Sequence, residues 1–505
     1  MNYFSNRLKT LSLICSGMLM LASQTYADED VNSATENFIN QKRAEMDKEQ
    51  EGVALAVEMY PFVIKSSIAP MDVAGLKFDK KNITSFSYNG QCALQQNNDK
   101  DFSFNDYKFF SQYSDLQSVE LSDLELTAQR LENLQKFLPR KLKGLAFSNC
   151  DITKKETPRL VDIIKTRQGM MSLTMSFPRC SSRKSTMFLE ALDQYGDMRF
   201  INLTFGHINT EGAKMIAEVL KNSSNTLQSL TLAIGYIEND DDNEGINVIL
   251  DAISSLKNLK QLEISFLELN EDACYKLFEI IGNFTDLRQL RLYIGNHEDY
   301  DQIKLFNGCE VCRDSIETMK KLEVLDISLM NLPESYMQLF AQSVAYLPEL
   351  RTLNISGNRL DEKGAEIFTN SFKNTDKLDV LMANSCNMDS QIFTTLCRSL
   401  NATSLREGYF SNNHIKEGIK GLPISSMKDL LVLDLSHNDI SYSELNSFIE
   451  SFNNATSVKV INLRGNFEEE RDNNVLRNFQ CDHLEQWKLK TFSDGRAPAL
   501  LGAYS

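Results

Sequence analysis

Histidine is scarce in this chain of 505 residues, and the motifs of familiar enzyme classes are missing. None of the five histidines lies in an HExxH pattern, which excludes the common zinc-protease helix. No GxSxG nucleophile elbow and no Walker-type GKS or GKT loop is found. We therefore expect no enzymatic activity and no cofactor. An enzyme whose site is assembled from scattered side chains stays open as an alternative.

Positive charge is also in short supply. Lys and Arg number 53 against 69 Asp and Glu, which gives a formal net charge of −16. A surface this acidic repels phosphate backbones, so we expect no nucleic-acid partner. The same field would steer a basic protein or peptide toward the chain. The alternative is that the charge only keeps a large surface soluble.

Long apolar runs are missing after the N-terminus. Residues 1–10 form a short basic segment, and residues 11–22 (LSLICSGMLMLA) are apolar. Thr25-Tyr26-Ala27 then offer small residues near a cleavage point before Asp28. This layout is typical of a secretory signal peptide over residues 1–27, and its apolar run is too short to span a membrane well. We expect a secreted or periplasmic protein without membrane insertion after signal removal, and the layout looks bacterial.

What the chain does have is a repeat. The pattern L-x-x-L-x-L-x-x-N-x-L occurs fourteen times, and the commonest step between copies is 28 residues. A fixed period in this range is typical of a solenoid. The first apolar positions are Leu116, Leu142, Met170, Met198, Leu227, Leu259, Leu287, Leu322, Leu350, Leu378, Leu405, Leu430, Val458 and Leu484.

The second half of each repeat has a helical rhythm. In one copy Gly212, Ala213, Ile216 and Leu220 follow the strand-like segment at spacings of three or four. Such spacing lines one face of a helix, whereas alternation lines one face of a strand. Each repeat therefore predicts one strand followed by one helix.

On these motifs the chain resembles leucine-rich-repeat proteins of the ribonuclease-inhibitor type, which also have repeats of about 28 residues with Gly near the helix start. The resemblance implies an α/β solenoid, a horseshoe with a concave parallel sheet and outer helices. One repeat cannot bury its own apolar face, so neighbours must stack. The fold does not specify a function.

The repeat pattern divides the chain. After the signal peptide we expect a charged lead and N-terminal cap over residues 28–82. About 14–15 repeats then span residues 83–490, and residues 491–505 form a tail. Two long repeats place insertions near residues 238–244 and 296–307, both between strand and helix. Insertions in repeat arrays often map to a binding edge.

Two short motifs invite a metal or redox interpretation. Cys309-Glu-Val-Cys312 has no second CxxC partner, which a zinc site would need. Core packing, a local disulfide and metal or redox chemistry stay open for it. The acidic stretch ENDDDNE at 238–244 lacks the glycine and spacing of an EF-hand loop. We expect a solvated loop there rather than a calcium site, and no metal site elsewhere.

A column of apolar residues directly follows six successive strand cores. Its members are Phe177, Phe205, Ile234, Phe266, Ile294 and Leu329. Exposed, they would form a contiguous apolar stripe of the kind that marks interaction sites. The same repeats lack the template Asn, so these side chains would alternatively fold inward and replace it.

The predicted sheet face is small and polar, with two aromatic residues as candidate anchors. We hypothesise an exported scaffold that binds a protein partner through the concave face and the strand-to-helix edge. The alternative is a bacterial effector that scaffolds a host protein. The candidate partner-binding residues are Phe177, Phe205, Ile234, Phe266, Tyr293, Ile294, Leu329 and Tyr409.

Overall fold

The computed structural model describes strands Val63–Ser66 and Ser85–Asn89, most of residues 116–466, and strand Gln486–Lys488. The gaps within 116–466 are 168, 239, 241–242, 268, 295–308, 331, 401–402, 417–426, 442–443, 445–456 and 464. The side chains of these three strands and of residues 309–310 also lie outside the described part. The chain divides into two compact units, Met1–Asn258 and Leu259–Ser505.

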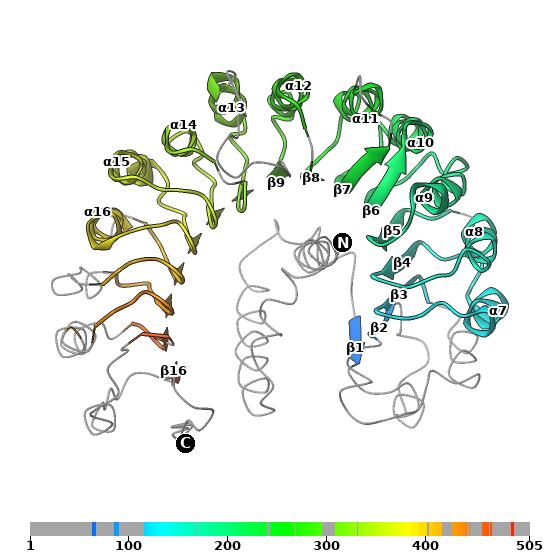
Figure 1. Cartoon of the computed structure of the whole chain (residues 1–505), viewed down its shortest axis with the longest axis horizontal. Helices are drawn as coiled ribbons and strands as arrows, with labels where there is room; N and C mark the ends of the chain where they lie inside the picture. Colours follow the sequence, from blue (N-terminus) through cyan, green and yellow to red (C-terminus); the bar gives the residue numbers. More distant parts are fainter. Residues whose placement is uncertain are drawn as a thin grey trace. The chain divides into compact units, whose positions relative to one another are not determined.

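The first unit contains a parallel sheet whose strands pair in chain order. Within this unit the strands follow the inner side of a curve and the helices its outer side (Figure 1). The strands are β1 (Val63–Ser66), β2 (Ser85–Asn89), β3 (Ser118–Ser122), β4 (Gly144–Ser148), β5 (Ser172–Phe177), β6 (Phe200–Asn209) and β7 (Ser229–Glu238). The described helices are α7 (Ala128–Phe137), α8 (Thr157–Lys165), α9 (Ser182–Leu189), α10 (Thr210–Asn222) and α11 (Glu244–Ser254).

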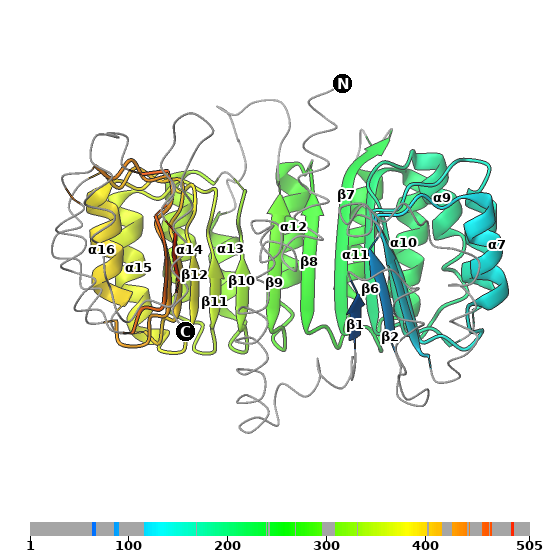
Figure 2. The same cartoon turned by 90° about the horizontal axis from the view of Figure 1, so that it is seen from below.

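The second unit has the same construction, again with parallel pairing in chain order. Its strands are β8 (Gln261–Phe266), β9 (Gln289–Ile294), β10 (Val324–Asp326), β11 (Thr352–Asn354), β12 (Val380–Met382), β13 (Glu407–Tyr409), β14 (Val432–Asp434), β15 (Val460–Asn462) and β16 (Gln486–Lys488). Its described helices are α12 (Glu271–Ile281), α13 (Cys309–Glu317), α14 (Glu334–Val344), α15 (Glu362–Ser371), α16 (Ser390–Leu400) and the 3-10 turn η1 (Phe372–Asn374). The strands of each unit are seen side by side in Figure 2.

The core of each unit lies between the strands and the helices. In β8, Leu262 and Ile264 alternate with polar neighbours and are buried. In α12, Cys274 and Leu277 face them from the helix and are fully buried. Burial of one large aliphatic side chain contributes about 1.5–3 kcal/mol. Stacked copies of this unit bury what a single copy cannot.

A polar residue begins several helices. The Asn209 side chain accepts a hydrogen bond from Gly212 N at 2.9 Å, and the Asp361 side chain accepts one from Gly364 N at 2.7 Å. These caps satisfy amides that the first helical turn leaves without partners. A Cβ on Gly364 would lie 2.8 Å from Leu360 Cδ1, so the leucine side chain would have to shift if this glycine were replaced.

An asparagine ladder follows the strands of the second unit. Asn413 Nδ2 donates to the carbonyls of Ala383 and Phe410 at 3.0 Å each. Its Oδ1 accepts from Cys386 N at 2.9 Å and from Met388 N at 3.1 Å. Each ladder amide thus links two neighbouring repeats. The equivalent residues are Asn358, Asn438 and Asn466.

The leucine-rich-repeat solenoid predicted from the sequence, with its parallel sheet and alternating helices, is confirmed. Strand β1 lies inside residues 28–82, where we expected a cap, and pairs with β2. The signal peptide, the C-terminal tail and the insertion at 296–307 lie outside the described residues.

Candidate functional site

The residue after each strand core takes one of two conformations. In β5 to β9 the strand continues through it. After β10 to β15 the strand has already ended, and this residue is left-handed with φ between 54° and 73°. The left-handed residues at this position in the second unit are Leu329, Gly357, Ser385, Asn412, His437 and Gly465.

Five of the six residues in the predicted apolar column are buried, so their assignment as exposed partner contacts was wrong. Side chains alternate along a strand, so Phe205 points to the same side as Leu203, toward the helices. Phe177 stacks on Phe188 of α9 with ring centroids 4.6 Å apart. The buried members are Phe177, Phe205, Ile234, Phe266 and Ile294, each at most 3% exposed.

Leu329 is the exposed member of the column. It is 53% exposed and left-handed, with φ of 58°. Met330 takes the inward position of the template Asn and is buried. The Leu329 side chain lies over Gly357, where an added Cβ would come within 2.6 Å of Leu329 Cδ2. The column therefore contributes one apolar side chain to the described surface of the second unit.

The two candidate tyrosines differ in access. Tyr293 is 6% exposed, and its hydroxyl donates to Asp326 Oδ2 at 3.1 Å. Burial, and then the Asp326 carboxylate, raises the pKa of the Tyr293 phenol. Tyr293 is therefore a structural residue rather than the exposed anchor we expected. Tyr409 is partly exposed, and its hydroxyl donates to Glu407 Oε2 at 2.8 Å.

A polar network crosses the face of β8 to β11 that points away from the helices. Asp326 accepts from Tyr293 and also from Asn354 Nδ2, at 3.1 Å each. Arg291 and Glu263 pair on the same face at 3.9 Å. Asp326 of β10 thus links β9 and β11 through Tyr293 and Asn354, whereas Arg291 Nε is buried without a hydrogen-bond partner in the described part of the chain.

Met382 and Tyr409 are partly exposed on the same face of the next strands, where Val380 and Val432 are also half-buried. Met382 and Tyr409 are register partners on β12 and β13, and both are half-buried. Among the described residues no helix covers this side of the two strands. Tyr and Met are enriched in interfaces, and aromatic anchors often dominate their binding energy. The sequence template assigned Tyr409 but missed Met382, whose strand position was the available signal.

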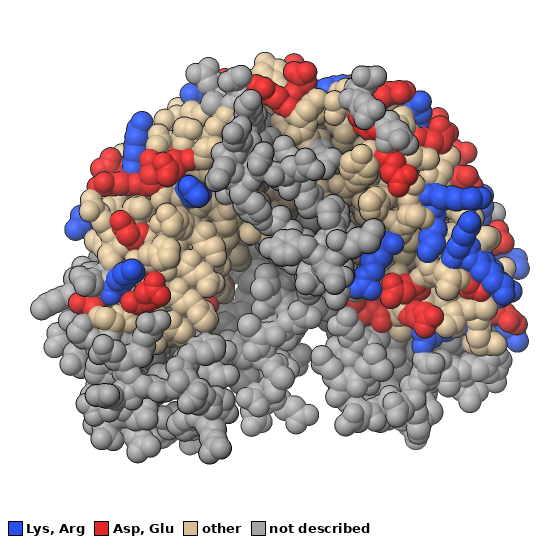
Figure 3. All heavy atoms as spheres, in the orientation of Figure 1, with Lys and Arg blue, Asp and Glu red and all other residues tan. Residues whose placement is uncertain are grey.

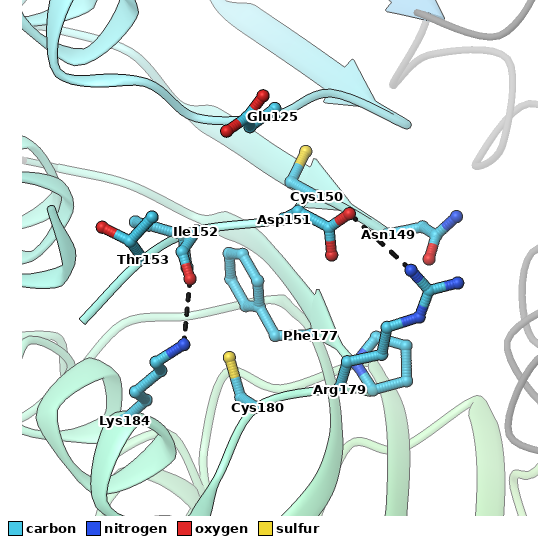
Figure 4. A pocket seen from close by; sticks show the side chains of 11 residues that line it. Glu125, Asn149, Cys150, Asp151, Ile152, Thr153, Phe177, Arg179, Cys180 and Lys184 are labelled. Carbon is cyan, nitrogen blue, oxygen red and sulfur yellow. Dashed lines mark hydrogen bonds and ion pairs between the residues drawn. The ribbon is translucent and has the colours of Figure 1, made fainter. Parts of the chain in front are cut away.

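The strand-to-helix edge of the first unit holds a pocket of about 160 Å³ (Figure 4). Arg179 pairs with Asp151 at 3.7 Å, and Lys184 Nζ donates to Ile152 O at 2.9 Å. The pocket wall thus carries two cations and two carboxylates. Its lining residues are Glu125, Asn149, Cys150, Asp151, Ile152, Thr153, Phe177, Pro178, Arg179, Cys180 and Lys184.

Basic side chains gather around this pocket. Figure 3 shows Lys and Arg concentrated over α7 to α9. Lys154, Lys155 and Arg183 are exposed and have no ion-pair or hydrogen-bond partner for their side chains in the described structure. The repeat template does not predict these residues, because they fall at positions where it specifies no residue type.

Strands β6 and β7 extend past the core as a two-stranded ribbon. A Cβ on Gly235 would lie 2.5 Å from Gly206 O, so the two backbones approach closely here. After Gly206 and Gly235 the alternation of buried and exposed side chains shifts by one residue. Ile237 is buried, whereas Tyr236 is 43% exposed and stands edge-on to His207 with ring centroids 6.2 Å apart.

The motifs considered for metals have structural roles where they are described. Asp240 of the acidic stretch accepts from Gly245 N at 2.7 Å and Ile246 N at 3.2 Å, so it caps α11. Cys312 is buried on α13, and the Cys309 side chain lies outside the described part. No group of three His, Cys, Asp or Glu side chains suited to a metal occurs in the described residues.

Within the same part of the chain, no helix has the length and apolarity needed to cross a membrane.

Comparison with known proteins adds a family match for two segments. A leucine-rich-repeat family model matches residues 347–366 and 426–443, which fall on the repeats that begin at Leu350 and Leu430. These two segments are therefore similar to the leucine-rich repeat. The ribonuclease-inhibitor type stays a prediction.

Two solved structures are similar to this chain. One is the TLR13–ssRNA13 complex, at 16% identity and a TM-score of 0.38, covering 76% of this chain and 47% of that one. The other is an internalin (inlF) from Listeria monocytogenes, at 13% identity and a TM-score of 0.37, covering 80% and 93%. This chain thus spans about half the length of the TLR13 chain.

Proposed function

We propose that the protein is a non-enzymatic scaffold that binds a protein partner through the free face of its parallel strands and the strand-to-helix edge. The observation that supports this most is the pair Met382 and Tyr409, half-buried on a sheet face that no described helix covers. Rigid strands hold both side chains in place, which lowers the entropy lost on binding. The net charge of −16 favours a partner that is basic overall.

A capture experiment tests the sheet face. The double variant Met382→Ala/Tyr409→Ala should lose its partner from native extract by at least about tenfold, because anchors of this kind are worth about 2 kcal/mol or more. The matched control is Tyr275→Ala/Tyr346→Ala, which removes two tyrosines that are 46% and 48% exposed. Mass spectrometry would quantify the captured proteins. Equal losses in both variants, or none in either, would contradict the proposal.

We also propose that the protein is exported and that residues 1–27 are removed. The basic start and the apolar residues 11–22 support this. N-terminal sequencing of the exported protein should begin at Asp28, and deletion of residues 2–27 should leave the protein inside the producing cell. Export with an intact Met1 would contradict the proposal.

A further inference from the structure

The charge of this acidic chain is unevenly distributed. Residues 123–190 contain thirteen Lys and Arg against seven Asp and Glu, a formal charge of +6. The whole chain carries −16, so the remainder carries −22. The basic residues that follow β4 and β5 lie at the strand-to-helix edge, and Figure 3 shows Lys and Arg gathered over α8 and α9. Residues 123–190 of the first unit therefore carry a net positive charge, although the chain as a whole is negative.

The cations at this edge are available to a ligand. Lys154, Lys155 and Arg183 are exposed and have no side-chain partner among the described residues. Arg179 has one carboxylate partner, Asp151, at 3.7 Å, and both side chains are more than half exposed. Exposed pairs of this kind contribute little to stability, so a competing carboxylate displaces Asp151 easily.

The helix start beside the pocket adds to this positive charge. Arg183 and Lys184 occupy the first turn of α9, and this turn has no acidic residue. The partial positive charge of a helix N-terminus favours anions. Glu238 already supplies one carboxylate here, since its Oε2 accepts from Ser182 Oγ at 2.6 Å, and Arg183 and Lys184 are the cations of the turn. The pocket of about 160 Å³ beside Lys184 and Arg179 has room for a carboxylate.

The size of the basic area limits what it can bind. It covers the loops after β4 and β5 and Arg130 at the start of α7. These belong to three neighbouring repeats, which at about 4.8 Å per strand span on the order of 10–15 Å. An extended peptide covers this distance with about four residues. A long nucleic acid would run beyond the area onto acidic surface and be repelled there.

We propose that this edge binds a short Asp- or Glu-rich segment of the protein partner, with one carboxylate between Arg179 and Lys184. The inference rests on the proposed scaffold function and adds the chemistry of one subsite. It concerns a different part of the chain from the sheet face, where a basic partner surface is expected.

A labelled hexaglutamate peptide is the probe, with hexaglutamine as the uncharged control peptide. Fluorescence anisotropy with the full chain should show binding of hexaglutamate only, weakened at high salt. Reversal of the three unpaired cations, Lys154→Glu/Lys155→Glu/Arg183→Glu, should weaken binding at least about tenfold. The matched control, Lys141→Glu/Lys143→Glu/Lys165→Glu, changes the net charge equally at the opposite edge and should change binding less than about twofold.

Two single variants test the pocket itself. Arg179→Gln should weaken hexaglutamate binding several-fold, whereas Asp151→Asn should strengthen it, because it removes the carboxylate that competes for Arg179. Equal effects of the two triple variants, or weaker binding by Asp151→Asn, would overturn the assignment. Tighter binding of a single-stranded oligonucleotide than of hexaglutamate would identify a nucleic-acid surface instead and would also overturn it.

The experiment is separable from the test of the sheet face. Met382→Ala/Tyr409→Ala should leave hexaglutamate binding unchanged, so loss of partner capture in that variant alone leaves the subsite intact. Loss of hexaglutamate binding in the basic-edge variant with full partner capture would leave the scaffold proposal intact, and would show that the acidic segment is not needed for it.

Discussion

At the residue scale, the direction of one side chain decides whether it can meet a partner. Phe205 and Tyr236 both lie on the long strands β6 and β7, yet Phe205 is 1% exposed and Tyr236 is 43% exposed. Alternation along the strand carries Phe205 inward. The close approach of Gly206 and Gly235 then exchanges the faces, which turns Tyr236 outward.

Truncation of these two aromatics should therefore have unequal costs. Phe205→Ala leaves a cavity in the core, and we expect the free energy of unfolding to fall by about 3–5 kcal/mol. Tyr236→Ala removes an exposed ring and should cost less than about 1 kcal/mol. Urea denaturation followed by circular dichroism would measure both. Similar costs for the two variants would refute the assigned side-chain directions.

The buried thiols should be inert in the folded protein. Burial raises the pKa of Cys150, Cys274 and Cys386 to about 12, and that of Cys180 to about 11. The thiolate is the reactive form, and at pH 8 its fraction at a pKa of 12 is on the order of 10⁻⁴. Iodoacetamide should therefore leave these four cysteines unmodified in native protein and modify them after unfolding, as peptide mapping would show.

The same shifts predict the response to alkali. The unfolded chain loses its thiol protons near pH 8.5, whereas the folded chain keeps them to a higher pH. The stabilisation is therefore complete below about pH 8.5 and falls as the pH rises toward the folded values. Cys274→Ala, which removes one such group, should flatten this decline; an unchanged slope would contradict the role of burial at Cys274.

At the scale of elements, strand length separates two kinds of repeat. Strands β10 to β15 are three residues long and are followed by a left-handed turn, which in several repeats is held by a ladder asparagine. Strands β5 to β9 are six to ten residues long, and an apolar side chain fills the corresponding space. In both kinds of repeat a side chain thus fills the space between strand and helix, an asparagine in one and an apolar residue in the other.

Removal of a ladder amide tests the first design. Asn413→Ala leaves the amides of Cys386 and Met388 without their acceptor in a buried site. We expect a loss of about 2–4 kcal/mol in unfolding free energy, since each unsatisfied buried group costs about 1–3 kcal/mol. The exposed Asn370→Ala is a suitable control, and thermal denaturation gives the comparison. A loss of unfolding free energy as small as that of the control would show that the ladder asparagine does not stabilise the protein.

The elements were largely predictable from the sequence, because a period of two followed by a period near 3.6 recurs fourteen times. The repeat starting at Leu350 predicted both β11 and α15. The site was less predictable. Whether Phe266 is buried or exposed depends on whether the strand ends at Ser265 or continues. The backbone conformation at this point follows from the packing of neighbouring repeats, which the sequence of one repeat does not specify. Lys154 and Arg183 lie at variable positions, where the template carries no information.

At the scale of the whole molecule, the repeat makes the stability of the chain approximately additive over its repeats. Register partners such as Val324, Thr352 and Val380 lie 28 residues apart, so each strand meets the next at the same position. Stability in such arrays is approximately a sum of repeat and neighbour terms. The charge follows the same logic, since a few successive repeats are enough to give one region its own sign.

Deletion of one complete repeat should therefore be tolerated. Without residues 350–377, Leu378 takes the place of Leu350, and β10 can pair with β12 in the existing register. The deletion is combined with Leu329→Gly, because Ser385 would otherwise take the place of Gly357 beside Leu329. We expect a folded protein with cooperative denaturation and a slightly smaller urea dependence, because less surface is exposed on unfolding. Deletion of residues 350–363 removes β11 and joins the segment after α14 directly to α15, and it should prevent folding. Equal circular dichroism spectra for the two deletions would argue against additivity.

The packing of Leu329 over Gly357 ties together two positions that are 28 residues apart in the chain. His437 lies over Gly465 in the same way. A side chain added at Gly357 or Gly465 would therefore require Leu329 or His437 to move, so the two members of each pair are coupled. Among descendants of this sequence, a side chain at position 357 should arise only after position 329 has shrunk, so the order of the two changes is itself constrained by the fold.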